Sequence, residues 1–167
     1  MKRLLQQGAY LFLLCAMAIS AAAQGTKTTP ESTFVEKAAQ GGLAEVELSK
    51  LAVSNSANDS IKQFAAQMIQ AHTENNASLT KIARAEGINV PNETDSDHLT
   101  LRNQLSTSKG ADFDRLYVQA MRSDHTAMLH LLEGTTDVKD PALQKFIAQT
   151  KPVVEQHLKM ANALTGT

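Results

Sequence analysis

Residues 59–72 read DSIKQFAAQMIQAH, and this stretch decides the class of fold. Its apolar side chains recur every three or four residues, at Ile61, Ala65 and Met68, which is the spacing of one face of an α-helix. The same spacing continues beyond the stretch to Leu79. The pattern therefore predicts a long amphipathic helix, because a half-buried strand would alternate apolar and polar residues instead.

Start and stop signals mark the ends of this helix and of three others. Asn58 is a good N-cap and Gly87 is typical of the residue after a helix end, so the first of the four is expected over 59–86. The same periodicity predicts further helices over residues 33–55, 112–133 and 141–164. Their terminal signals are a Thr33-x-x-Glu36 capping box, Gly134 as a stop, and Asp140 followed by Pro141 as a start.

The lengths of the connections predict how the helices are arranged. Residues 56–58 and 134–139 are short links, so each joins two antiparallel neighbours. The link between Gly87 and Ala111 is long, and its segment 95–105 has helical character of its own. A link of this length can cross the whole bundle, which predicts an all-α fold: a ferritin-like four-helix bundle with a long crossover that carries a short helix. A simple up-down bundle with an extra short helix is the alternative.

A pair of glycines interrupts the helix expected over 33–55. Each of Gly41 and Gly42 costs about 1 kcal/mol relative to alanine inside a helix. The pair indicates either close approach of another helix, or a local bend, or simply a weak point of the helix.

The N-terminus has the pattern of a secretory signal peptide. A basic start is followed by an apolar run, densest over 10–19, and by an Ala-x-Ala cleavage pattern that predicts a signal peptide over residues 1–23. An uncleaved membrane anchor is the alternative. Residues 24–32 are then a polar leader and 33–167 the bundle domain. Cleavage would remove Cys15, the only cysteine, and would change the net charge from −1 to −3 because Lys2 and Arg3 are lost.

Composition restricts the partners and the chemistry. The chain has 16 Lys and Arg against 17 Asp and Glu, so no basic surface for nucleic acid is expected. We expect no membrane association after signal cleavage, and the sequence identifies no protein or small-molecule partner. A cysteine-free mature chain excludes disulfides and thiolate chemistry. The sequence also shows no phosphate loop, nucleophile elbow or other catalytic motif, so no catalytic or organic-cofactor residues are assigned.

Each predicted helix carries an ionisable side chain in its apolar stripe. These candidate metal ligands are Glu45, His72, Asp124 with His125 at the stripe edge, and His157. A carboxylate and several histidines in a bundle core can bind a divalent transition metal. The same side chains can instead hydrogen-bond one another in a polar core network, or reach solvent at the edge of a wide stripe. Two other histidines, His98 in the crossover and His130 on a polar face, are expected at the surface.

The chain carries the motifs Phe34-Val35, Gly41-Gly42, Glu45-Val46-Glu47-Leu48, Phe64-Ala65, His72-Thr73, Phe113-Asp114, Asp124-His125, Pro141-Ala142-Leu143 and His157-Leu158. Together these motifs resemble those of an exported bacterial family, the domain-of-unknown-function family 4142. The resemblance implies a ferritin-like bundle in the periplasm or cell envelope and supplies no established activity. Ferritin-like di-iron proteins carry Glu-x-x-His on two helices, but here Ile69 and Val154 stand three residues before His72 and His157. A metal would therefore occupy a mononuclear, histidine-rich site.

Two functions are consistent with the sequence. The first is an exported, non-enzymatic binding or envelope-stress module whose Glu and His form a polar core network. The second is a mononuclear Zn, Mn, Fe or Cu protein, with redox activity as one form of it, that uses the same residues as a metal site.

Overall fold

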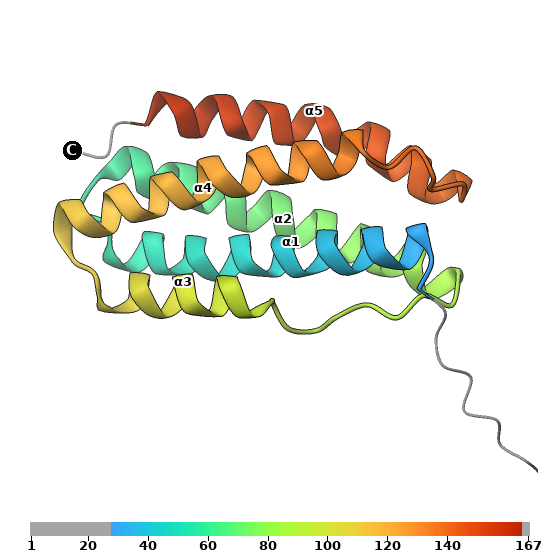
Figure 1. Cartoon of the computed structure of the whole chain (residues 1–167). Helices are drawn as coiled ribbons and strands as arrows, with labels where there is room; N and C mark the ends of the chain where they lie inside the picture. Colours follow the sequence, from blue (N-terminus) through green and yellow to red (C-terminus); the bar gives the residue numbers. More distant parts are fainter. Residues whose placement is uncertain (1–27, 165–167) are drawn as a thin grey trace, which may run out of the picture.

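The computed structural model describes residues 28–164, which fold into four long helices and one short one (Figure 1). The expected signal peptide over 1–23 lies outside the described residues. No helix among those described is long and apolar enough to cross a membrane. The helices are α1 Pro30–Asn55, α2 Asp59–Ala85, α3 Ser96–Thr107, α4 Gly110–Glu133 and α5 Pro141–Ala163.

The helix starts follow from their capping residues. Asn58, Asp95 and Asp140 accept backbone N–H groups of the first turns of α2, α3 and α5, as N-caps do. The predicted start of α1 is wrong. Its capping box is made by Thr29 and Ser32, and Pro30 occupies the first turn, so α1 begins three residues before Thr33 and takes up the end of the expected polar leader.

The long crossover has the predicted course. Helices α1 and α2 pack together as one antiparallel pair, and α4 and α5 form the other. The chain after α2 returns along the bundle through α3, so that α4 starts at the same end as α2 and runs parallel to it (Figure 1). Helix α3 lies outside the four-helix core, against α1 and α4.

The apolar core consists of two clusters that lie toward opposite ends of the bundle. One cluster includes the edge-on pair of Phe64 and Tyr117, and the other includes the edge-on pair of Phe34 and Phe146. The residues between these clusters along all four long helices include the polar positions singled out in the sequence. The bundle therefore carries a polar layer between two apolar ones.

The close approach of α2 requires a glycine at one of the two positions in α1, Gly42. A Cβ atom at Gly42 would lie 2.1 Å from the side-chain oxygen of Asn76 on α2, which is far inside contact distance. A Cβ at Gly41 would meet only the end of the Met128 side chain, at an ordinary 3.5 Å. Close helix approach, one of the predicted reasons for the pair, thus applies to Gly42.

Candidate metal centre

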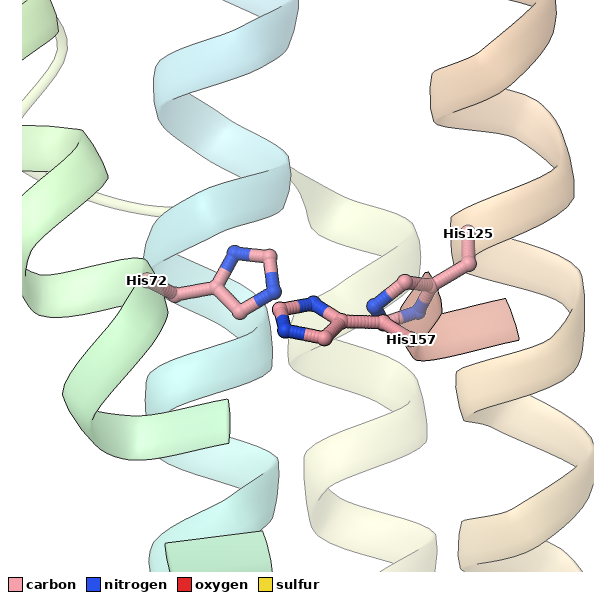
Figure 2. Close-up of side chains that lie close together, drawn as sticks. All are labelled: His72, His125 and His157. Carbon is pink, nitrogen blue, oxygen red and sulfur yellow. The ribbon is translucent and has the colours of Figure 1, made fainter. Parts of the chain in front are cut away.

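Four ionisable side chains, one from each long helix, meet in the polar layer. They are Glu45 of α1, His72 of α2, His125 of α4 and His157 of α5, and their exposed fractions are 2%, 6%, 0% and 7%. Figure 2 shows the three imidazole rings pointing toward one another from their separate helices. The ring centroids are 5.3–5.5 Å apart in all three pairs.

Glu45 joins two of the histidines. Its Oε2 lies 2.7 Å from Nδ1 of His72, and its Oε1 lies 3.1 Å from Nδ1 of His125. The His125 Nδ1 also lies 2.8 Å from the backbone oxygen of Met121, one turn earlier in α4. The Nδ1 side of both rings is therefore occupied by oxygen acceptors.

The opposite side of the cluster holds nitrogens that have no such partner. Nε2 of His72, Nε2 of His125 and Nδ1 of His157 are buried and make no hydrogen bond within the protein. One ring nitrogen from each residue lies within 4.8 Å of the other two. Nitrogen ligands at about 2.1 Å from one tetrahedral metal are about 3.4 Å apart, so the ring nitrogens would have to approach one another by up to about 1.4 Å to share one ion.

The electrostatics of the cluster favour an anionic Glu45. Burial opposes its ionisation, but His72 and His125 beside it outweigh burial and hold the pKa of Glu45 at about 2. Burial lowers the pKa of His72, but the Glu45 carboxylate more than offsets this and raises it above 6.5. Burial, together with the other two histidines, lowers the pKa of His157 to about 4, so this ring is neutral at ordinary pH.

Asp124 does not join this cluster. It precedes His125 on α4, and its Oδ1 lies 3.6 Å from Nε2 of His98, while Nδ1 of His98 lies 2.6 Å from Asp95. The expectation that His98 is a plain surface residue is wrong, because its side chain is only 20% exposed and both ring nitrogens face carboxylates. The Asp124 carboxylate, opposed by burial and helped by Asp95, raises the pKa of His98 to about 9. His130 is exposed, as expected.

The structure has two acid–histidine clusters: the buried cluster of Glu45 with the three histidines, and the cluster of His98 with Asp95 and Asp124. A groove runs between them. It has a volume of about 820 Å³ and is lined mainly by α1, α4 and the segment that follows α4. Phe34, Met128 and Leu131 form part of its apolar wall, and Glu45 and Asp124 belong to its polar lining. Glu45 thus stands between the groove and the three histidines.

The structure brings together four of the five candidate residues. Glu45, His72, His125 and His157 meet, and the histidines alone place a nitrogen each where one ion could contact all three. Within residues 28–164 no second group of three His, Cys, Asp or Glu side chains has ligand atoms that close together. The role of His98 was not predicted from the sequence, although an N-cap aspartate three residues before a histidine was a signal that could have indicated the pairing.

Comparison with known proteins identifies relatives by sequence family and by fold. Residues 16–164 match the family model described as Domain of unknown function (DUF4142). The sequence matches no functionally curated protein. Among solved structures, a DUF305 fragment from Deinococcus radiodurans is similar with a TM-score of 0.72 at 14% identity, covering 81% of this chain and 94% of its own.

A second solved structure has the same fold. It is a DUF305 protein from Streptomyces coelicolor whose secretion is predicted, with a TM-score of 0.67 at 12% identity, covering 80% of this chain and 90% of its own. At these identities the likeness concerns the fold alone. It supports the all-α bundle predicted from the sequence.

Proposed function

This chain belongs to the DUF4142 family, and we propose that it is an exported helical bundle that binds one divalent transition-metal ion through His72, His125 and His157. The site would be mononuclear. Glu45 would lie beside it, and Asp124 would take no part because it pairs with His98 instead.

The three unpartnered nitrogens are the observation that carries the proposal. A buried polar atom without a hydrogen bond costs about 1–3 kcal/mol, and here three of them converge on one point. A metal ion would satisfy all three at once, since each neutral imidazole offers a lone pair. Hydrogen bonds among the three rings would need at least one ring to carry its proton on the facing nitrogen, whereas a bound ion needs no such proton.

The donor set indicates the class of metal. Imidazole nitrogens suit Zn, Cu, Fe and Ni, whereas Mg and Ca prefer oxygen ligands. Three protein ligands leave a coordination position open on a tetrahedral ion, as in zinc sites that hold a water or substrate. A bound ion would supply Lewis-acid chemistry or, for Cu or Fe, electron transfer.

A polar core network is the second candidate, and the Glu45 contacts favour it. A carboxylate between His72 and His125 would stabilise the pairing of α1 with α2 and α4 without any metal. In this case the protein is a binding or envelope-stress module that is held in register by the polar layer. The two candidates differ in one measurable property, the stoichiometry of bound metal.

Export to the periplasm or cell envelope is part of the proposal. Its support is the signal-peptide pattern of residues 1–23 and the predicted secretion of the similar Streptomyces protein. Reporter fusion of residues 1–30 to a protein that is active only in the periplasm would test it.

Metal analysis of the exported protein tests the proposed function. The chain is purified without a histidine tag, stripped with a chelator and titrated separately with Zn, Cu, Mn and Co(II), the last because its visible spectrum reports tetrahedral coordination. We expect one ion per chain for at least one of these metals, and loss of that binding in His72→Ala. His130→Ala is the matched control, because it removes an exposed histidine of α4 and leaves the cluster intact. Substoichiometric binding by the wild type for every metal would favour the polar network.

A further inference from the structure

We propose that Glu45 is a positioning residue of the metal site and not a ligand: it holds the ring protons of His72 and His125 on Nδ1, so that both present Nε2 to the ion. This inference rests on the proposed metal-binding function for its purpose. Its structural content, the tautomer of each ring, can be tested without metal.

Both carboxylate oxygens of Glu45 lie against a ring nitrogen in a close charged contact, although Oε2 makes no aligned hydrogen bond. Oε2 lies against Nδ1 of His72 at 2.7 Å and Oε1 against Nδ1 of His125 at 3.1 Å. A neutral imidazole has one N–H and one lone pair, and an anionic oxygen repels a lone pair at this distance. The proton of each ring therefore belongs on Nδ1, which leaves the lone pair on Nε2.

The ring nitrogens that lack a hydrogen bond agree with this assignment. The buried nitrogens without a hydrogen bond in these two rings are the Nε2 atoms, which are the ones that the assignment leaves with a lone pair. Carboxylates that accept the second N–H of a metal-bound histidine are common, and they fix both the tautomer and the orientation of the ring. Glu45 would serve two ligands at once in this way.

The two rings do not depend on Glu45 equally. Nδ1 of His125 has a second acceptor, the carbonyl oxygen of Met121 at 2.8 Å, which can only accept. Nδ1 of His72 is paired with Glu45 alone among the described residues, at 2.7 Å. Loss of the carboxylate should therefore release His72 and leave His125 in place.

His157 completes the set by a different route. Its buried, unpartnered nitrogen is Nδ1, and Glu45 makes no ion pair with it. Its proton must therefore lie on Nε2 for the lone pair to face the other rings. The site needs two rings of one tautomer and one of the other, and Glu45 contacts only the two that require Nδ1–H.

Glu45→Gln tests this role with the smallest change of shape. The amide keeps one acceptor oxygen but replaces the other oxygen with an NH₂ donor, which cannot face an Nδ1–H. Since Met121 still holds His125, we expect His72 to change to the Nε2–H tautomer, and the metal affinity to fall about 10- to 100-fold. Glu47→Gln is the matched control, because Glu47 lies on the same helix, is half-exposed and pairs with Arg102.

The tautomer of each ring is the property to measure, because it would not change in Glu45→Gln if Glu45 had only a structural role. Long-range nitrogen–proton NMR correlations of the metal-free wild type, over an alkaline pH series, should show Nδ1–H at His72 and His125 and Nε2–H at His157. In Glu45→Gln the His72 pattern should change. Wild-type rings in the opposite tautomers would overturn the inference even if the variant does not fold.

The two proposals fail in different ways. Wild-type protein that binds no metal but shows the expected tautomers would overturn the proposed function and support the role of Glu45 in orienting the rings. Wild-type protein that binds metal, with an unchanged affinity in Glu45→Gln, would support the proposed function and overturn the role of Glu45.

Discussion

Two acid–histidine clusters lie on either side of α1 and α4, and their histidines are used in opposite ways. In the buried cluster, one nitrogen of each ring is left without a partner and the three such nitrogens converge. In the cluster around His98, both nitrogens of a single ring face carboxylates, those of Asp95 and Asp124. The residue types are the same, but only the first arrangement offers lone pairs to a metal.

The difference shows that the charge of a histidine is set by its partners and by its burial together. His98 between two carboxylates is held as an imidazolium, with a pKa of about 9, and it ties the start of α3 to α4. His157, which is buried and lies beside two other histidines, has a pKa of about 4 and stays neutral. A neutral ring can bind a metal, whereas an imidazolium has no lone pair to give.

The largest expected effect is the stabilisation of the protein by bound metal, which should depend on the buried cluster and not on the cluster around His98. A ligand present at a hundred times its Kd stabilises a protein by about 2.7 kcal/mol, which is roughly 8 °C in Tm for a domain of this size. We expect this shift in the wild type and in His98→Ala, and its loss in His157→Ala. Thermal unfolding with and without the metal that binds best measures it.

The comparison fails if the two variants respond alike. A full metal-induced shift in His157→Ala would mean that the ion is held elsewhere. Loss of the shift in His98→Ala would mean that the second cluster also contributes to the metal site.

The second prediction concerns the stability of the metal-free protein near neutral pH. His98→Ala removes two partly exposed ion pairs, one to Asp95 within the crossover and one to Asp124 on α4, so we expect the free energy of unfolding to fall by about 1 kcal/mol. The N-cap of α3 remains, because Asp95 still accepts the backbone N–H groups of Asp97 and residue 98. Urea unfolding measures the change, and an unchanged midpoint would show that the pairs contribute nothing.

The third prediction is the pH dependence of that difference. The pKa of His98 rises from 6.5 in the unfolded chain to about 9 in the folded one, so the folded state holds the proton more tightly. The stabilisation is fully present below pH 6.5 and is lost as the pH rises through about 9. The gap between wild type and His98→Ala should therefore close in alkaline solution, and a gap that widens there would contradict the assigned charge.

The parts of the fold and of the candidate site that could be predicted from the sequence are those in which apolar periodicity alone determines whether a side chain faces the core. The four long helices and the long crossover follow from apolar spacing and link length, and so does the presence of Glu45, His72 and His157 in the apolar stripes. Asp124 and His125 are 100° apart on one helix, and the sequence placed Asp124 in the stripe and His125 at its edge. The packed bundle buries His125 completely and turns Asp124 toward His98.

The other wrong predictions also concern features that the periodicity of a single helix does not determine. The rotation of α4 is set by the side chains that meet it from α1, α3 and α5, and none of these contacts is encoded in the pattern of α4 alone. The partner of His98 depends on where the crossover crosses α4, which link length does not specify. The start of α1 lies at the Thr29 cap and not at the predicted Thr33, because Pro30 favours the first turn of a helix.

The smallest expected effect concerns the two glycines of α1. Gly41 faces Met128 at the groove, and Gly42 faces Asn76 of α2. Gly41 and Met128 both line the groove, and an added Cβ at Gly41 meets Met128 at 3.5 Å. We therefore expect Gly41→Ala to raise the free energy of unfolding by up to about 1 kcal/mol, since alanine is the better helix former and nothing must move. Metal affinity should not change.

Gly42→Ala gains the same helix propensity but should show no net stabilisation. Its Cβ would lie 2.1 Å from Oδ1 of Asn76, a buried atom with no hydrogen-bond partner of its own, so the Asn76 side chain or the helix must shift. Asn76 lies one turn beyond His72, and Gly42 lies one turn before Glu45, so a shift here separates the two side chains whose 2.7 Å contact orients His72. Urea unfolding and metal titration of both variants test this. Equal stabilisation with unchanged affinity in both would show that the close approach of α1 and α2 is not what holds Glu45 against His72.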